Sequence, residues 1–313
     1  TGDPDFLQKF LNQVRKDYTV GSEDRNDVEF TGQRILWILD KNGKKDYIRI
    51  HQEKAIDLLC ESEVPKGIAD TEKLEPKFHT EFRSLLGSIN WIQSRTQYPY
   101  CYAFSRLASA SANPTVGDLK QLNKLCRQIR SEPAELRFWP LKGILRLLSI
   151  PDAAYRNNAD KSSQRGQTLF LAEARTKNYN TRGSLVYYES TKIRKTTLST
   201  TVAELYSLMK AYGAAQLVRG LWKDISGDTA DIHMRTDANN LVTTASTTHV
   251  PEQQETIHMI QMLRKEACSG SIADLAHVAT NDCLAECLTK ASANSLNLRN
   301  AVMTGILKNI DCH

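Results

Sequence analysis

The sequence lacks the features that mark several specialised classes of protein. No stretch approaches the roughly 20 consecutive apolar residues that a membrane-crossing helix needs, so we expect no membrane partner. The chain has no internal repeat and no low-complexity tract, and its first residues are neither a signal peptide nor a transit peptide. A repeat architecture and a low-complexity tail are therefore not expected, and an ordinary globular chain of two or three domains is expected.

Cysteine is sparse and gives no disulfide framework. The seven cysteines are an odd number, scattered and mostly in apolar contexts, which indicates a reduced intracellular protein, in the cytoplasm or the nucleus. Cys283 and Cys287 stand four residues apart with His277 nearby, so a zinc site is an alternative there, but no second closely spaced pair completes four ligands. Thr1 stands where an initiating Met would be, and we expect a processed product or a fragment.

No single sign of charge dominates the sequence. The net charge of +5 permits a polyanionic partner without requiring one. Basic residues nevertheless gather in one part of the second half of the chain, where they are candidates for holding phosphates. These candidates are Arg156, Lys161, Arg165, Lys192, Arg194 and Lys195. The alternative for each of them is an ordinary solvated surface charge.

Four acidic residues spread over the second half are the most informative feature that is present. Each lies where the local pattern indicates the end of a strand or the start of a helix, and such positions can direct side chains at one point. The four are Asp152, Glu204, Asp237 and Glu286. Converging carboxylates repel one another unless cations neutralise them, and their hard oxygen atoms suit Mg²⁺. Two Mg²⁺ ions about 3.5–4 Å apart cleave phosphodiesters, so the pattern predicts a metal-dependent nuclease.

The first 135 residues are expected to form a small antiparallel sheet followed by helices. Residues 4–16 have helical spacing of apolar residues, and the Asn42-Gly43 pair indicates a hairpin between two strands within residues 28–51. A charged loop over about residues 63–77 is the first plausible domain boundary. Residues 79–130 are then mostly helical in pattern.

The remainder of the chain alternates strands and helices. Three strands come first, and the Arg165-Gly166 step suits a turn between two of them. A long helix follows Ser199, whose hydroxyl is a suitable N-cap, and a short strand ends at Asp237. Two further helices, a last strand near residues 274–280 and a final helix carrying Glu286 complete the order. This order predicts an α/β domain around a mixed sheet.

Several segments of the chain match, in order, the motifs of one known family. Residues 82–115 are similar to the pattern YRSLVGSLLYL…YAVS.LSRF…PT, and the segment around Asp152 is similar to SDADWAGD..DRKSTSGYVFL. LSTTVAELYSL, RTDANN and VATNDCLAECLTK are similar to ALSSTEAEYMAL, CDNQSAI and VPT.EQLADILTK. Residues 30–59 are similar to the region downstream of a polymerase active site. Collinear over nearly the whole chain, these motifs resemble copia-type LTR retrotransposon Pol polyproteins.

The resemblance implies the C-terminal part of a reverse transcriptase followed by a ribonuclease H domain. Residues 1–60 would be the end of the palm and the start of the thumb, and residues 61–135 a helical thumb- or connection-like region. Residues 136–313 would be a ribonuclease H-like α/β domain with a mixed sheet and flanking helices, preceded by this α+β segment. The Tyr-x-Asp-Asp motif of the polymerase is absent from the sequence, so no polymerase activity is expected from this chain alone.

The resemblance also assigns roles to the acidic residues. Asp152 and Asp237 would bind two Mg²⁺ ions, with Glu204 and Glu286 completing one ion each. One ion would activate water and the other would stabilise the leaving 3′ oxygen of RNA. The implied partner is an RNA–DNA hybrid, in which the RNA strand is recognised through its 2′-hydroxyl groups. His277 is a candidate accessory residue for product release.

Some positions depart from the family pattern. Pro151 replaces a Ser, and because proline is poorly placed inside a central strand, it predicts an early strand end that displaces Asp152. Val202 replaces the first Glu of Glu-Ala-Glu, at a position that is not expected to be a ligand. Glu286 is one methylene longer than the usual Asp, and His258 stands where the family has Asp.

Two non-catalytic alternatives remain at this stage. The chain is either an enzyme or a decayed or co-opted retroelement fragment that keeps the fold and binds nucleic acid without turnover. A third interpretation is a structural subdomain that supports a polymerase, supplied by the upstream segment or another copy of the polyprotein. The four acidic residues favour catalysis, whereas Pro151 and the missing polymerase motif favour the other two interpretations.

Overall fold

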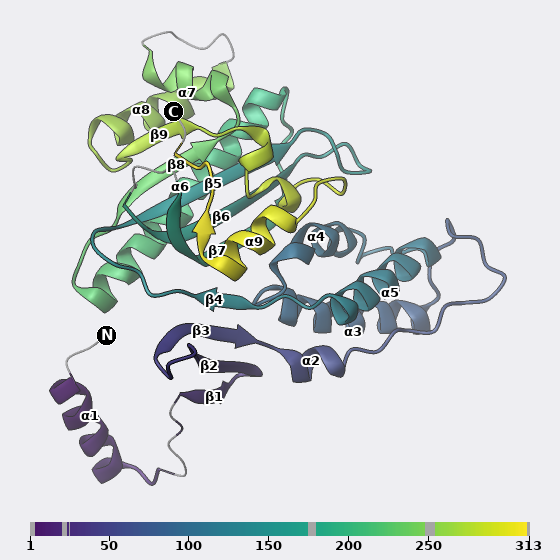
Figure 1. The fold of residues 1–313 in the computed structure, drawn as a ribbon. Coiled ribbons are helices and arrows are strands. Elements are labelled where there is room, and N and C mark those ends of the chain that lie inside the picture. Colours follow the sequence, from purple (N-terminus) through teal and green to yellow (C-terminus); the bar gives the residue numbers. More distant parts are fainter. Residues whose placement is uncertain (1–3, 21–23, 25, 175–179, 248–253, 312–313) are drawn as a thin grey trace.

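The chain forms two β-sheets and a group of helices beside them (Figure 1). The computed structural model describes residues 4–20, 24, 26–174, 180–247 and 254–311. The smaller sheet has the strand order β1-β2-β3-β4, and the larger has the order β10-β7-β6-β5-β8-β9. No helix among the described residues is long and apolar enough to cross a membrane.

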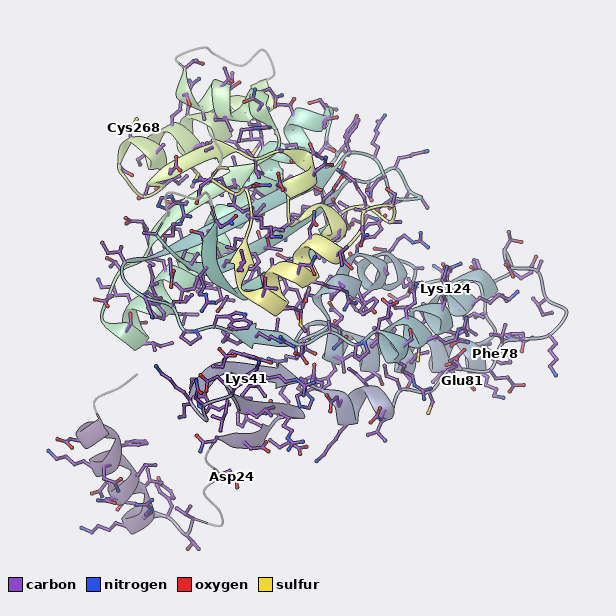
Figure 2. All side chains as sticks on the ribbon, in the orientation of Figure 1. Asp24, Lys41, Phe78, Glu81, Lys124 and Cys268 are labelled. Atoms are coloured by element: carbon purple, nitrogen blue, oxygen red, sulfur yellow. The ribbon has the colours of Figure 1, made fainter. Side chains whose placement is uncertain are left out.

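The smaller sheet is built around the predicted hairpin. Gly43 adopts φ +75° in the turn between two antiparallel strands, a conformation that favours glycine. Before them lies a third strand, which the pattern had not separated, and the turn at Thr31-Gly32 joins it to the hairpin. The elements of this part are α1 (Pro4–Asp17), β1 (Asp27–Phe30), β2 (Gln33–Leu39), β3 (Lys45–His51), α2 (Glu53–Asp57) and β4 (Leu136–Phe138). Lys41 lies in the hairpin turn (Figure 2).

The predicted helical region contains three α-helices and one short 3₁₀ turn. They are α3 (Pro76–Gln93), η1 (Tyr98–Tyr100), α4 (Cys101–Ser109) and α5 (Val116–Ser131). The last helix begins with a capping box, in which the Thr115 hydroxyl accepts from the Asp118 backbone N–H at 3.2 Å and the Asp118 carboxylate accepts from the Thr115 N–H at 2.9 Å. Buried leucines line its inner face at helical spacing, which explains why the sequence pattern located it well.

The larger sheet is mixed. β5 pairs antiparallel with β6 and parallel with β8, while β6 pairs antiparallel with β7 and β8 pairs parallel with β9. Its strands and helices are β5 (Leu145–Ala154), β6 (Gln164–Glu173), β7 (Thr181–Lys192), α6 (Thr200–Ser226), β8 (Asp231–Thr236), α7 (Asn239–Ser246), α8 (Gln254–Cys268), β9 (Asp274–His277), η2 (Thr280–Asp282), η3 (Glu286–Leu288), α9 (Leu296–Thr304) and β10 (Ile306–Leu307). Ser199 caps α6 as predicted, accepting from the Val202 N–H at 3.2 Å.

Alternate residues of the central strand bury opposite faces of this sheet. Leu147 packs with the inner faces of α6 and α8, whereas Leu148 and Ile150 pack with the C-terminal segment. Both faces are therefore covered, which explains why nearly every residue of the strand is buried. The apolar cluster that contains Leu148 and Ile150 also includes Tyr98 and Cys101 from the helical region. The two parts of the chain therefore share one apolar layer.

Three predictions about individual positions were wrong. Pro151 does not end β5, which continues to Ala154; the parallel pairing with β8 ends at Ser149, so the missing N–H at Pro151 interrupts no bond to that strand. Arg165 and Gly166 are not a turn but lie inside β6, where Gly166 pairs with Asp152.

The expected final helix around Glu286 was also wrong. The segment forms the short turns η2 and η3, and the C-terminal α-helix, α9, comes later in the chain. We call residues 280–288, from the start of η2 to the end of η3, the C-terminal strap. The strap lies so close to β6 that a Cβ atom on Gly166 would come within 2.7 Å of the Leu288 Cβ atom. Close packing on the sheet therefore sets the course of the strap, and the sequence pattern does not show such a contact.

Candidate metal-dependent nuclease site

Asp152 lies at the centre of the site, on the central strand of the larger sheet. Its side chain is 1% exposed although it is a carboxylate. One oxygen, Oδ2, accepts a hydrogen bond from the Thr289 hydroxyl. The other, Oδ1, is buried and has no hydrogen-bond partner among the described residues. A buried acceptor without a partner costs free energy, and a bound cation would remove this cost.

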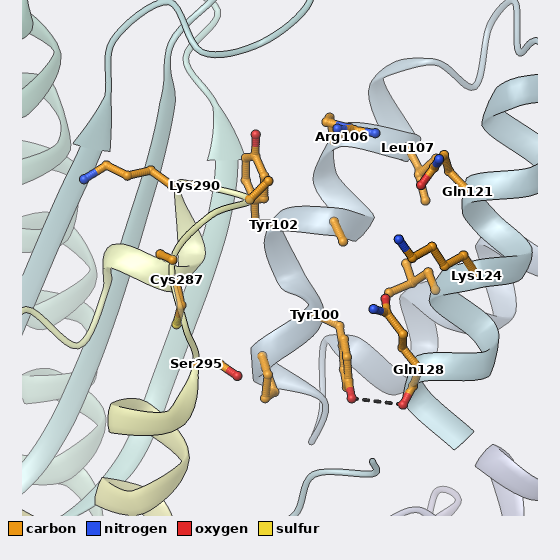
Figure 3. A pocket seen from close by; sticks show the side chains of 15 residues that line it. Tyr100, Tyr102, Arg106, Leu107, Gln121, Lys124, Gln128, Cys287, Lys290 and Ser295 are labelled. Atoms are coloured by element: carbon orange, nitrogen blue, oxygen red, sulfur yellow. Dashed lines mark hydrogen bonds between the residues drawn. The ribbon is translucent and has the colours of Figure 1, made fainter. Parts of the chain in front are cut away.

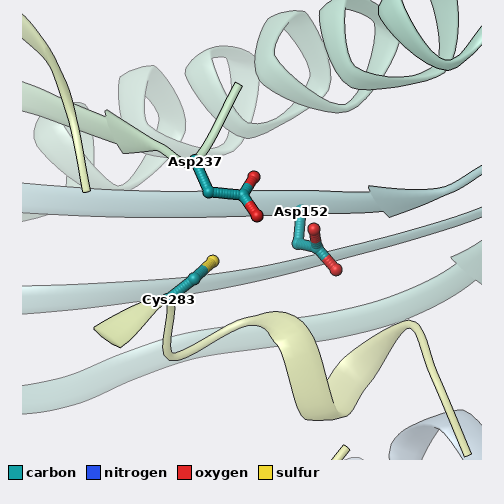
Figure 4. A group of neighbouring side chains, drawn as sticks. All are labelled: Asp152, Asp237 and Cys283. Atoms are coloured by element: carbon teal, nitrogen blue, oxygen red, sulfur yellow. The ribbon is translucent and has the colours of Figure 1, made fainter. Parts of the chain in front are cut away.

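Asp237 and Cys283 approach Asp152 from two other elements (Figure 4). Asp237 directly follows β8, and Cys283 follows η2 in the C-terminal strap. One ligand atom from each of the three residues lies within 4.8 Å of the other two. Because β5 and β8 are parallel neighbours, Asp152 near the end of β5 and Asp237 just after β8 lie near the same edge of the sheet. Strand order therefore brings together two residues that are 85 positions apart in the sequence.

Glu204 lies on α6, which packs across the sheet, and its side chain is 8% exposed. The neighbouring Ser207 on the same helix donates to the Asp152 backbone carbonyl at 2.9 Å, which fixes this part of the helix against the strand. Burial raises the pKa of Glu204, and the nearby Asp152 and Asp237 carboxylates raise it further, while a hydrogen bond from the Ala153 backbone opposes the rise. Glu204 is thus close enough to both aspartates to interact with their charge.

Glu286 reaches the site from the opposite side, in η3, with a side chain that is 31% exposed. Lys290 links it to the centre, since its Nζ atom lies 3.3 Å from Glu286 Oε1 and 3.9 Å from Asp152 Oδ2. Burial alone would lower the pKa of Lys290, but the Asp152 and Glu286 carboxylates outweigh that effect and raise it. All four predicted acidic residues are therefore electrostatically connected around Asp152.

The donor set fits a hard divalent cation. Burial raises the pKa of Asp152, and repulsion from Asp237 and Glu286 adds to this effect, while Lys290 and Thr289 oppose it. A cation would reverse the repulsion and stabilise the ionised carboxylates. Burial and the Asp152 and Asp237 carboxylates raise the pKa of the Cys283 thiol well above its ordinary value. The oxygen donors favour Mg²⁺ over zinc.

His277, the candidate accessory residue, ends β9 opposite Thr236, the residue before Asp237. It is half-buried, and the donor group of Asp152, Asp237 and Cys283 does not include it. Its proposed role in product release stays a prediction.

Most of the predicted phosphate-binding residues surround one cavity on the same domain. The cavity has a volume of about 340 Å³ and is lined by Arg156, Lys161, Lys192, Arg194 and Lys195, together with several Ser and Thr residues. Lys192 pairs there with Asp160. Arg165 lies apart from this group and pairs with Glu189 at 2.7 Å on the neighbouring strand.

Sequence reasoning missed two residues that contact or approach Asp152, Thr289 and Lys290, and it considered Cys283 only as part of a zinc site. A signal was present for Thr289 and Lys290, because both follow Glu286 within the LTK motif. It was not used, since a final helix carrying Glu286 was expected there.

Comparisons with known proteins locate this fold among solved structures. No family model matches the chain, and no curated protein matches it. LC11-RNase H1 in complex with an RNA/DNA hybrid shares 15% identity over 46% of this chain and 94% of that chain, with a TM-score of 0.34. RNase H1 from the halophilic archaeon Halobacterium salinarum NRC-1 shares 19% identity over the same fractions, with a TM-score of 0.31.

A longer similarity involves the foamy viral protease-reverse transcriptase in complex with an RNA/DNA hybrid. It covers 88% of this chain and 34% of that chain at 14% identity, with a TM-score of 0.47. The larger sheet of this chain is mixed and has flanking helices, as the sequence predicted.

Proposed function

We propose that the chain is a Mg²⁺-dependent endonuclease that cleaves the RNA strand of RNA–DNA hybrids. The observation that supports it is the meeting of the buried Asp152 and Glu204 with the half-buried Asp237, contributed by a strand, a helix and a second strand end. Carboxylates that served only as solvated surface charges would not be buried together with one oxygen lacking a partner. Such an arrangement is costly without a cation and favourable with one.

Each side chain has a separate part in this mechanism. Asp152 and Asp237 would hold two Mg²⁺ ions, and Glu204 and Glu286 would complete one ion each. The ions would supply an activated water and charge stabilisation for the leaving 3′ oxygen. Thr289 donates to Oδ2 of Asp152, which orients the carboxylate and leaves Oδ1 free for a ligand.

The wider context follows from the sequence resemblance. We propose that the chain is part of a copia-type polyprotein, with a palm end over residues 1–60, a thumb- or connection-like region over 61–135 and the nuclease domain over 136–313. The upstream polymerase segment or another copy of the polyprotein would be its partner. Its substrate occurs inside the cell, in the cytoplasm or the nucleus.

The direct test is cleavage of a hybrid labelled on the RNA strand, with Mg²⁺ and with EDTA. Wild-type chain is compared with Asp152→Asn and Glu204→Gln, and with Glu63→Gln as a matched control in an exposed loop. We expect Mg²⁺-dependent cutting of RNA that falls at least a hundredfold in the two site variants and is unchanged in the control. Loss of activity in the control, or activity that persists in both site variants, would contradict the assignment.

One observation favours the non-catalytic alternative. The Lys290 amine places a positive charge beside Asp152 and Glu286, where it can take the place of a metal ion. If the folded wild-type chain binds the hybrid without cutting it in Mg²⁺, the chain is a nucleic-acid-binding remnant and Lys290 stabilises its carboxylates permanently. If it neither binds nor cuts, the structural-support interpretation remains.

A further inference from the structure

A second cleft lies between the helical region and the nuclease-like domain (Figure 3). Helices α4 and α5 form one wall, and the segment from Cys287 to Ser295 forms the other. Its volume is about 300 Å³, several times the roughly 30 Å³ that one water molecule occupies in the liquid. We call it the α4–α5 cleft.

The charge of the α4–α5 cleft is positive. Among its fifteen lining residues none is acidic, whereas Arg106, Lys124 and Lys290 are basic. Neither Arg106 nor Lys124 forms an ion pair within the part of the chain that the structure describes. In Figure 3 the Lys124 amine points into the cleft, and the Arg106 guanidinium lies at its upper edge beside the Gln121 amide.

Other cations on the same helix contrast with Lys124. Lys120 pairs with Asp70 at 2.5 Å, and Arg127 pairs with Glu61. These two neighbours of Lys124 on α5 therefore have counter-ions, whereas Arg106 and Lys124 at the mouth of the cleft have none among the described residues. Unpaired cations with an amide donor between them are suited to phosphate oxygens.

The floor of the α4–α5 cleft is held by hydrogen bonds between the two parts of the chain. The Tyr100 hydroxyl donates to the Gln128 carbonyl at 3.1 Å and to the Glu132 carbonyl at 2.7 Å. Arg299 of α9 donates to the same hydroxyl at 3.1 Å. The cleft is thus preformed, and binding there would not require ordering of its walls.

The cleft is also continuous with the carboxylate site. Asn157 donates to the Tyr102 hydroxyl of the cleft at 3.3 Å and to the Thr289 carbonyl at 2.6 Å, and Thr289 itself contacts Asp152. Lys290 lines the cleft with its stem while its amine reaches Asp152. A chain of covalent and hydrogen-bonded neighbours therefore joins the cleft to the reaction centre.

We propose that the α4–α5 cleft binds the phosphate backbone of a nucleic-acid strand whose neighbouring phosphate lies at the carboxylates. Arg106 and Lys124 each neutralise one phosphate, and Gln121 donates to an oxygen or a sugar hydroxyl. The recognition is of the backbone and not of the bases, because the lining offers cations and amides at the mouth. The proposal rests on the proposed nuclease function, since it places the same substrate in a second contact.

The test measures how salt affects the binding of an RNA–DNA hybrid in EDTA, where no cutting occurs. The double variant Arg106→Gln/Lys124→Gln is compared with Lys120→Gln/Arg127→Gln, which removes the same charge from α5 outside the cleft. Each lost phosphate contact reduces the slope of log K against log salt by about 0.7 to 0.9. We expect the cleft variant to lose about 1.4 to 1.8 in slope and about tenfold or more in affinity at 0.15 M salt. The control variant should change little.

The outcomes separate this proposal from the proposed function. Equal slopes in the two double variants, or a wild-type chain that does not bind the hybrid, would overturn the cleft assignment. Binding with the expected slope change but no cutting in Mg²⁺ would uphold the cleft and reject the nuclease. If the wild-type chain cuts, the cleft variant should raise KM and leave kcat within about twofold, because neither residue touches the reacting atoms.

Discussion

Replacing Glu204 by Gln should stabilise the metal-free protein, and the effect should grow with pH. Burial and two neighbouring aspartates raise the pKa of Glu204 to about 9 from an ordinary 4.5. Between these values the folded chain binds more protons at this site than the unfolded chain, so the free energy of unfolding falls as the pH rises. Each pKa unit corresponds to about 1.4 kcal/mol, which sets an upper limit of about 5 kcal/mol at pH 8. Asp152 shares the same repulsion. The free energy of unfolding of Glu204→Gln should therefore exceed that of the wild type by about 2 to 5 kcal/mol at pH 8 and by under about 1 kcal/mol at pH 5.

The assay is urea unfolding of wild type and Glu204→Gln at pH 5 and pH 8 in EDTA, with Glu63→Gln as the exposed control. Mg²⁺ should stabilise the wild type more at pH 8 than at pH 5, because its binding displaces protons, and should stabilise Glu204→Gln less. A Glu204→Gln chain that is no more stable than wild type at pH 8, or equally shifted at both pH values, would refute the electrostatic reasoning.

Two further predictions concern a buried ion pair and the close packing beside Asp152. Asp311 is fully buried and accepts hydrogen bonds from Arg146 at 3.1 Å and Arg235 at 2.8 Å, so Asp311→Ala should cost about 3 to 5 kcal/mol of unfolding free energy. Asp311→Asn keeps an acceptor and should cost less, and equal losses in urea titrations would contradict the ion-pair argument. Gly166→Ala should cost about 1 to 3 kcal/mol and reduce cleavage, because the new methyl group would displace Leu288 in the strap. Unchanged stability in the same titrations would show that the strap yields easily.

Local sequence signals located much of the candidate site. A strand end placed Asp237, and the N-cap hydroxyl of Ser199 fixed the start of the helix that carries Glu204. These signals work because capping and periodicity involve residues only a few positions apart. For the same reason, the hairpin at Gly43 and the helix capped by Thr115 were predicted correctly.

Contacts between distant residues limited what local patterns revealed. A proline rule predicted an early strand end at Pro151, but the parallel partner strand stops pairing first, at Ser149. Gly166 was predicted to lie in a turn, yet it lies within β6. The strap passes directly over it and leaves no room for a Cβ atom. The apolar and small residues around Glu286 suited a helix, whereas packing on the sheet holds them in short turns.

The sequence by itself determined the α/β class, most of the order of the elements and the four acidic candidates, because periodicity, caps and motif order depend on neighbouring residues. Only the tertiary structure showed that Thr289 and Lys290 contact or pair with Asp152, and that Arg106 and Lys124 share a cleft without counter-ions. Such relations join residues more than a hundred positions apart or on separate helices, and they form when burial of the apolar faces sets the position of each element.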